Sequence, residues 1–280
     1  MKPDLQQILE TGRFDEAIAA VEAAIRAAPG DAALRQQLFQ LLAVTGQWAR
    51  AGQQMATAGS LNPKLTPTVL AYRGLVEAEL VRQAVFAGTP TPMLMGEPEP
   101  WMAVWLKAAE AVTKAQFAEA AALRDEALDQ SPATPCVRTP PAAGDDPPAQ
   151  QVLPGFLDAD TRLGPMLEGV IDGKYYWIPV CRLAELEVSP PECLADSVWA
   201  SVRFKWTAGG ESHGFIPARY PNSERNQDPA IRLGRSTEFI DAGEGSSFGL
   251  GHRLFLTGND DVGEVGLLEL GAIRFEEAGA

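Results

Sequence analysis

The sequence predicts an α+β protein in which an N-terminal α-helical solenoid is followed by a β-rich domain, built as an antiparallel sheet or a small barrel. Three observations carry this prediction. They are a 34-residue repeat near the N-terminus, a proline-rich stretch near the middle, and short apolar and aromatic runs between turn residues afterwards. We expect a helical domain at residues 1–130, a linker at 131–150 and a β-rich domain at 151–280.

An internal repeat organises the first sixty residues. Six residues recur 34 positions later, so that Gly12, Phe14, Ala17, Val21, Ala24 and Pro29 match Gly46, Trp48, Ala51, Met55, Ala58 and Pro63. This period, with small residues where helices cross and a proline closing each unit, is typical of tetratricopeptide (TPR) repeats. The pattern returns 103 residues after its first occurrence, at Ala115, Phe117, Ala120, Ala127 and Pro132. We therefore expect a TPR-like solenoid of about seven helices stacked in antiparallel pairs.

Two further helices belong to this half of the chain. The segment Thr66–Ala87 is rich in Ala, Leu and Val, and it should form a long helix that ends at Gly88. Pro100 suits the first turn of the next helix, Trp101–Lys114. Such a stack can hold a peptide or helix on its concave face, or it can simply support the second half of the chain.

The stretch Ser131–Gln150 holds six prolines. Because proline lacks an N–H donor and fixes φ, we expect neither a helix nor a central strand there. The stretch should be an extended connector and the domain boundary.

Short strands with frequent turns are expected after residue 150. The runs that predict them are Tyr175–Val180, Val198–Trp206, Gly214–Ile216, Arg253–Thr257 and Val265–Phe275. Gly164-Pro165 and Asp172-Gly173 predict tight turns, the second of them inside a hairpin. One short helix can begin at Pro190 and end near Trp199.

Composition excludes several functional classes. The net charge is −14, with the larger excess of acids in the second half, and such a chain repels the phosphate backbone of nucleic acids. No apolar run reaches the ~18 residues that span a bilayer, and the N-terminus lacks the apolar core of a signal peptide. Cys136, Cys181 and Cys193 are odd in number and lack CxxC spacing, which argues against disulfides and a zinc site. We expect a cytoplasmic protein.

Six blocks follow one another in the second half: D-A-D-T-R-L-G-P-M-L-E, G-K-Y-Y-W-I-P-V, D-S-V-W, F-I-P-A-R-Y-P, R-S-T-E-F and G-L-G-H-R. Together they resemble the ImpE family, also called SciE or TagJ, whose members are accessory proteins encoded with bacterial type VI secretion systems. The likeness runs from Tyr72 to Phe275, and it includes Glu79, Arg82, Phe86 and Gly88.

The resemblance implies a helical N-terminal region, a β-rich C-terminal region and no known enzymatic activity. We expect no cofactor. It also implies a partner, because at least some members bind the N-terminal helix of the small subunit of the contractile sheath. That interaction links them to sheath assembly and, indirectly, to its disassembly by the ClpV ATPase.

The sequence departs from the family pattern at three positions. Pro154-Gly155-Phe156 stands where the family has a tryptophan shortly before D-x-D. Ala195 replaces an arginine before the Asp of D-x-x-W, and His252 replaces a frequent Gln before the last arginine. Contacts made through these positions in the family are not carried over to this chain.

Thirteen motif residues are predicted to bind the partner or to hold the β-rich domain together: Asp158, Asp160, Arg162, Glu168, Tyr176, Trp177, Arg182, Asp196, Trp199, Arg219, Tyr220, Arg235 and Arg253. Arginines in motifs often pair with internal carboxylates such as Asp160, Glu168 or Asp196, so we favour a buried or half-buried ion network. Arg162, Asp160 and Glu168 should pin the turn that begins the β-rich domain. The aromatic residues should fill its core or form a partner surface.

A literal G-x-S-x-G at Gly210–Gly214 suggests an alternative, a serine hydrolase that uses Ser212. A nucleophile elbow needs a helix directly after the serine, and Pro217 and Pro221 interrupt any helix there. We therefore favour a hairpin turn. A general TPR scaffold for several partners is the other alternative.

Metal and phosphate sites are also weakly indicated. Asp158 and Asp160 could hold a divalent cation, but Arg162 would neutralise the pair and oxygen-only sites need several ligands. The glycines from Gly243 to Gly251 lack the Lys-Ser/Thr of a phosphate loop and favour a flexible hairpin loop. The chain is thus predicted to be a binding protein without metal or catalytic residues.

Overall fold

The computed structural model describes residues 11–142, 144 and 148–276. Its N-terminal part is helical, with α2 (Phe14–Ala27), α3 (Ala32–Val44), α4 (Trp48–Leu61), α5 (Thr66–Phe86), α6 (Pro100–Thr113) and α7 (Phe117–Gln130). No helix among the described residues is long and apolar enough to cross a membrane.

The 34-residue repeat relates α2 to α4. Phe14 and Trp48 begin the two helices, and both side chains are buried. Gly12 and Gly46 precede them with φ of +70° in each case, a left-handed conformation that costs glycine no Cβ strain. The prediction of TPR-like helices is confirmed.

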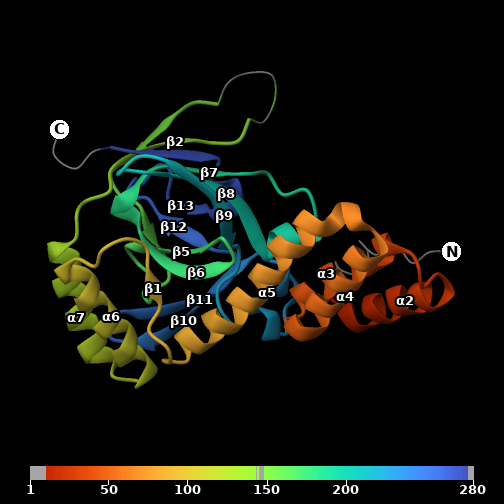
Figure 1. Ribbon diagram of the computed structural model, residues 1–280. Helices are drawn as coiled ribbons and strands as arrows, with labels where there is room; N and C mark the ends of the chain where they lie inside the picture. The colour runs from red at the N-terminus through yellow and green to blue at the C-terminus, as the bar shows by residue number, and fades with distance from the viewer. Residues whose placement is uncertain (1–10, 143, 145–147, 277–280) are drawn as a thin grey trace.

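The helices form two groups instead of one solenoid. Helices α2 to α5 stack in chain order on the right of Figure 1, whereas α6 and α7 pack on each other at the left. After α5, Gly88 (φ +96°) and the prolines Pro90 and Pro92 prevent a return helix. The chain instead forms the short strand β1 (Met93–Leu94) and reaches the sheet. The predicted pairs of packed helices are thus present, but α6 and α7 do not extend the stack of α2 to α5.

A sheet of nine strands, counted in the described part of the chain, forms the centre of the β-rich region. Its order is β1, β6 (Lys174–Pro179), β5 (Met166–Ile171), β9 (Glu211–Pro217), β8 (Trp199–Trp206), β7 (Leu183–Val188), β14 (Ala272–Phe275), β2 (Cys136–Thr139) and β3 (Gln151–Leu153). Its neighbouring strands are antiparallel except for β1 and β6. The predicted β-rich region is thus an antiparallel sheet.

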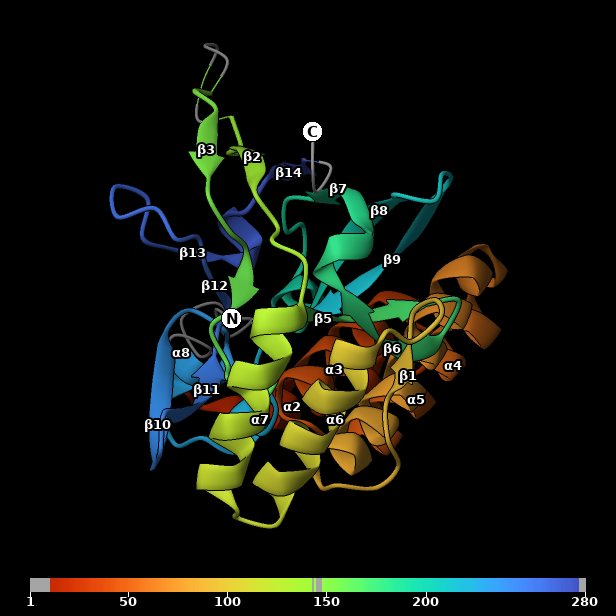
Figure 2. The same ribbon diagram turned by 90° about the vertical axis from the view of Figure 1, so that its left-hand side faces the viewer.

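Smaller elements complete this region (Figure 2). The hairpin β10 (Thr237–Gly243) and β11 (Ser246–Gly251) stands at one side, and β12 (Leu254–Leu256) pairs with β13 (Glu264–Gly266) and β4 (Leu157–Asp158). The single-turn helices are η1 (Pro63–Leu65), η2 (Val180–Arg182), η3 (Leu194–Ser197), η4 (Ser223–Arg225), α8 (Pro229–Arg232) and η5 (Leu267–Glu269). The helix predicted from Pro190 to Trp199 is reduced to η3, and η5 interrupts the strand predicted at Val265–Phe275.

The proline-rich stretch contributes a strand to the large sheet. Strand β2 lies between β14 and β3 and pairs antiparallel with both. The prolines nearest to it, Pro135 and Pro140, flank the strand, so each of its four residues keeps an N–H for the ladder. We expected no central strand in residues 131–150, and this was wrong, because β2 is paired on both sides. The division of the chain into domains at this stretch stays a prediction.

The β5–β6 hairpin forms at the predicted Asp172-Gly173 turn. Both residues have positive φ, +50° and +72°, as a two-residue type I′ connection requires. The turn touches α5 closely, because a Cβ added to Gly74 would lie 2.7 Å from the Cα of Gly173. The hairpin therefore packs directly on α5.

The helical stack and the sheet share a hydrophobic core. Trp199 of β8 is buried, and its ring centroid lies 6.3 Å from Phe39, 5.7 Å from Trp48 and 6.2 Å from Tyr72. A second cluster is built from the β-rich region, with Phe156, Phe204 and Phe255 among its members. The first cluster fixes α3, α4 and α5 against the sheet.

Candidate functional site

The loop between β4 and β5 holds the first predicted site residues. The Oδ1 atom of Asp158 accepts the N–H of Asp160 at 2.9 Å, and Oδ1 of Asp160 accepts the N–H of Arg162 at 2.9 Å. These successive side-chain-to-backbone bonds make a tight turn. Gly164 ends it with φ of +49°, and a Cβ there would lie 2.5 Å from the ring of Trp105. Only glycine fits that position.

Arg162 closes the turn. Its Nε donates to Oδ1 of Asp160 at 2.9 Å and its Nη2 donates to Oδ2, which also accepts the N–H of Gly249 at 2.9 Å. The guanidinium lies between two rings, 4.9 Å from the centroid of Phe86 and 4.7 Å from that of Phe248. Such cation–π contacts hold the arginine in place.

Arg253 connects this loop to β5. It is fully buried, and its two Nη atoms donate to the carboxylates of Asp158 and Glu168. Its Nε donates to the carbonyl of Pro217 at 2.9 Å. The hydroxyl of Tyr220 lies 3.1 Å from Oδ1 of Asp158. All three guanidinium nitrogens of Arg253 therefore donate a hydrogen bond.

Glu168 is the centre of the network. Its Oε1 accepts Nε of Arg82 at 2.6 Å and the hydroxyl of Tyr175 at 2.5 Å, while its Oε2 accepts Nη2 of Arg82 at 3.0 Å and a bond from Arg253. Trp177 donates its Nε1–H to the hydroxyl of Tyr175 at 2.8 Å. Burial disfavours the charged carboxylate, but the two arginines outweigh it and lower the pKa of Glu168 to about 2.

Helix α5 supplies two charged residues to the network, Glu79 and Arg82. They lie one helical turn apart, and Nη1 of Arg82 is 3.5 Å from Oε2 of Glu79. Trp199 donates its Nε1–H to Glu79 at 2.9 Å, and Arg82 donates to the carbonyl of Arg219 at 2.8 Å. Both residues belong to the ImpE-like segment, yet the sequence did not assign them to the site. The sequence feature that could have identified them is a pair of opposite charges on a helix face that is otherwise apolar.

Arg219 ties the helical stack to the same network. Its Nη1 donates to the carbonyl of Val44 at the end of α3, at 3.0 Å, and to the carbonyl of Arg232. Burial lowers the pKa of Arg219 to about 10, which still leaves the guanidinium charged at neutral pH. The network thus joins α3, α5, the sheet and the loop that follows β9.

The chemistry open to this network is limited. Its carboxylates at positions 158, 160 and 168 are almost fully buried and each pairs with an arginine. No group of three or more His, Cys, Asp or Glu residues in the described chain could hold a metal ion. Burial, with the charge of Asp160, outweighs the attraction of Arg253 and raises the pKa of Asp158 to about 7. The arrangement holds elements together and presents no exposed reactive group.

Four predicted site residues lie outside the network. Tyr176 points away from its neighbours Tyr175 and Trp177, because side chains alternate along β6, and it is half-buried. Asp196 pairs with no arginine of the described chain. Its Oδ2 accepts the backbone N–H of Glu192 and of Cys193 at the start of η3, which corrects the expectation of an ion pair. Arg235 is exposed. Arg182 lies at a surface groove described below.

The positions that depart from the family pattern have structural roles here. Ala195 is buried within η3. His252 is buried, its Nε2 accepts the N–H of Leu268 at 3.2 Å, and burial lowers its pKa. Gly155 is half-buried, and its N–H donates to the carbonyl of Thr257 at 3.2 Å.

Ser212 does not stand on a nucleophile elbow. It lies inside strand β9, which continues to Pro217, and its Oγ accepts the Nε1–H of Trp206 at 3.1 Å. The tight turn of the hairpin precedes it at Gly209 and Gly210, which have φ of +89° and +83°. The structure thus has the predicted hairpin, and Ser212 lies within a strand that continues to Pro217, so the strand-to-helix turn on which the serine-hydrolase alternative depends is not formed at this serine.

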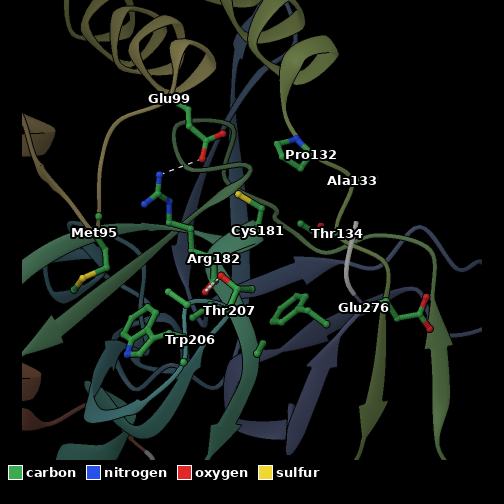
Figure 3. A pocket seen from close by; sticks show the side chains of 16 residues that line it. Met95, Glu99, Pro132, Ala133, Thr134, Cys181, Arg182, Trp206, Thr207 and Glu276 are labelled. Carbon is green, nitrogen blue, oxygen red and sulfur yellow. Dashed lines mark hydrogen bonds and ion pairs between the residues drawn. The ribbon is translucent and has the colours of Figure 1, made fainter. Parts of the chain in front are cut away.

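A groove of about 700 Å³ opens where the start of α6, the α7–β2 connection and the ends of β7, β8 and β14 meet (Figure 3). We call it the β7 groove and define it by Met95, Arg182, Leu183, Trp206, Phe275 and Glu276. The Nη2 atom of Arg182 lies 3.1 Å from Oε1 of Glu99 and also donates to the carbonyl of Glu97. Its Nε–H is buried without a hydrogen-bond partner among the described residues.

A second groove, of about 660 Å³, runs beside α5. We call it the α5 groove, and its charged lining residues are Arg73, Glu77, Asp172, Lys174 and His213. The β5–β6 turn forms its other wall. Both grooves are large enough to take part of a partner chain.

The chain resembles several known proteins. Residues 151–274 match the ImpE protein family and residues 9–71 match a tetratricopeptide repeat family. The chain is 39% identical over 275 residues to the type VI secretion system accessory component TagJ of Pseudomonas aeruginosa. The aligned residues make up 98% of this chain and 92% of that relative. The crystal structure of protein VPA1032 from Vibrio parahaemolyticus has the same fold, with a TM-score of 0.81, 24% identity and 97% of each chain covered.

Proposed function

The chain belongs to the ImpE family, and on that premise we propose that it is a non-enzymatic accessory protein of a bacterial type VI secretion system. The observation that carries the proposal is the 39% sequence identity between this chain and TagJ, in an alignment that covers 98% of this chain. TagJ is named as an accessory component of that system, and an adaptor role suits a chain built from a TPR-like stack and a sheet.

The partner that we propose is the N-terminal helix of the small subunit of the contractile sheath. TPR-like stacks and grooves bind amphipathic helices through apolar residues spaced i, i+3, i+4 and i+7. The β7 groove and the α5 groove are open surfaces of suitable size for such a helix. By holding this helix, the protein would influence sheath assembly or its ClpV-dependent disassembly.

Two features support a non-enzymatic protein of the cytoplasm. The carboxylates of Asp158, Asp160 and Glu168 are buried and paired with arginines, so they are not exposed as general acids or bases. Cys136, Cys181 and Cys193 are free thiols, as is usual in a reducing compartment.

The test is a calorimetric titration of the full chain with a peptide of the cognate sheath subunit's N-terminal helix. We expect saturable binding with one peptide per chain, and no binding of a peptide of the same composition in scrambled order. The absence of heat at high micromolar peptide would refute the proposal.

A general scaffold for several partners is the second candidate, and the tetratricopeptide match at residues 9–71 supports it. This candidate predicts that residues 1–130 alone capture the same partners as the full chain. The shared core opposes it, because Trp199 of the sheet covers Phe39, Trp48 and Tyr72 of the helices. A fragment without the sheet would expose these rings.

A further inference from the structure

We infer that the β7 groove is the docking site for an amphipathic helix, which places a bulky apolar side chain in the groove and a basic residue beside Glu276. The inference rests on the proposed function, because it names the surface that takes the helix of the sheath subunit. It follows from the shape of the groove, the fixed position of its aromatic walls and the charge of its rim.

The walls of the groove are apolar and already in place. Trp206 is half-buried and stacks on Phe204 with centroids 5.5 Å apart, while Phe275 packs edge-on against Phe156 at 5.7 Å. Both rings are therefore held from behind and cannot fold in to fill the space. A groove of about 700 Å³ falls in the range that binds organic ligands and large side chains. An inserted Leu, Phe or Trp would displace water from both aromatic walls.

The charge of the rim favours a partner helix that carries a basic residue beside its inserted apolar side chain. Arg182 is the basic residue of the groove, and its charge is offset by Glu99 at 3.1 Å. Glu276 is exposed and has no ion-pair partner among the described residues, so its carboxylate leaves the rim negative. The whole chain adds to this field, with a net charge of −14. A lysine or arginine on the partner would complement the rim and speed association.

Arg182 can also adjust to an occupant. Its Nη2 binds Glu99 and the carbonyl of Glu97, but its Nε–H has no acceptor in the described chain. A buried donor without an acceptor is unfavourable, so the guanidinium gains by re-pairing with a partner oxygen.

The groove offers little to the other common mode of peptide binding, in which a strand adds to a sheet edge. Strand β7 pairs with β8 at Leu183 and with β14 from Glu185 to Glu187, so on the β14 side only Leu183 and Ala184, which line the groove, have no strand partner in the described chain. Two residues give an added strand few main-chain hydrogen bonds, so the occupant engages mainly through side chains. A helix presents side chains in that way.

The α5 groove provides the comparison. Arg73, Lys174 and His213 share its lining with Glu77 and Asp172, and Arg73 pairs with Glu77 at 3.1 Å. Its charges are nearly balanced and lie on the walls, so an apolar anchor would have to desolvate them. This groove is therefore the matched control site.

The experiment measures the affinity of the full chain for the sheath-helix peptide by calorimetry, in four variants. Ala208→Trp fills the β7 groove from an exposed wall position, and Glu276→Lys reverses the rim charge. Ala71→Trp fills the α5 groove in the same way, and Glu238→Lys makes the same charge change on exposed β10. We expect the first two to weaken binding at least about tenfold and the two controls to change it less than about twofold.

A charge swap separates contact from instability. If Glu276 meets a basic residue, the peptide with that residue changed to Glu should bind Glu276→Lys better than the wild-type chain, as a double-mutant cycle requires. If the wild-type chain binds the peptide and both β7-groove variants bind it with the same affinity as the wild-type chain, this inference is overturned and the proposed function stands. Loss of binding only in Ala71→Trp would move the site to the α5 groove. A wild-type chain that does not bind the peptide would refute both.

Discussion

Nε of Arg82 on α5 lies 2.6 Å from Oε1 of Glu168 on β5, and both side chains are buried. The two residues are separated by 86 positions in the sequence. The pair joins the TPR-like stack to the sheet, and Arg253 extends it to the loop at Asp158. Breaking one member of a buried ion network leaves the others charged and unpaired, so the network sets the first three predictions.

Replacing Glu168 with Gln should destabilise the protein strongly. Gln keeps the shape but not the charge, so Arg82 and Arg253 would stay buried with too little negative charge near them. We expect a loss of about 3–5 kcal/mol in the free energy of unfolding, measured by urea denaturation. The control is Glu187→Gln, whose side chain is half-exposed beside Arg203, and it should change the midpoint little. Equal effects of the two changes would contradict the role of Glu168.

Stability should also fall in acid because of Glu168. Its pKa is about 2 in the folded protein, held down by the two arginines against burial, whereas the ordinary value is 4.5. The unfolded chain therefore binds the proton first as the pH decreases. The contribution of Glu168 is complete above pH 4.5 and is lost as the pH falls from 4.5 towards 2. Urea midpoints at pH 5, 4 and 3 should decrease, and the decrease should be smaller in Glu168→Gln.

Asp158 has the opposite pH dependence. Burial raises its pKa from 3.8 to about 7, so the folded state keeps a proton that the unfolded state has released. Stability from this group is present at low pH and is lost as the pH rises from about 4 to about 7. Asp158→Asn should flatten the pH dependence of unfolding between these values. An unchanged slope in this variant would show that another group titrates there.

Two glycine-to-alanine changes in neighbouring helices should have opposite effects. In Gly74→Ala the new Cβ would meet the Cα of Gly173 at 2.7 Å, and backbone cannot move aside cheaply. In Gly52→Ala the nearest atom is Cγ1 of Val76 at 3.6 Å, an ordinary contact. Alanine in a helix interior normally stabilises by about 0.5–1 kcal/mol over glycine. Thermal unfolding should therefore show a higher midpoint for Gly52→Ala and a lower one for Gly74→Ala.

The local features of the fold were predictable from the sequence. The 34-residue repeat identified α2 and α4, because buried Phe14 and Trp48 and the turns at Gly12 and Gly46 follow from short-range periodicity. The Asp172-Gly173 hairpin followed from its turn chemistry in the same way. In both cases the partners lie near each other in the chain.

The long-range features were not predictable. The roles of Glu79 and Arg82 could not be assigned from the sequence, because their partners Trp199 and Glu168 lie 120 and 86 residues away. Asp196 looked like an arginine partner, but its carboxylate satisfies two backbone N–H groups next to it. A charge pattern shows that a residue needs a partner, whereas only the fold decides which one it meets.

The strand in the proline-rich stretch has a consequence for the order of folding during synthesis. Residues 136–139 leave the ribosome early, but one of their two neighbours is β14 at residues 272–275. Strand β7 also pairs with β14 and therefore cannot complete its pairing before residues 272–275 are synthesised. Strand β14 therefore completes the sheet, and a nascent chain that ends before residue 272 presents two unpaired strand edges, on β2 and β7, that can pair with another molecule. Protection of these edges against aggregation thus depends on four residues that are synthesised long after β2.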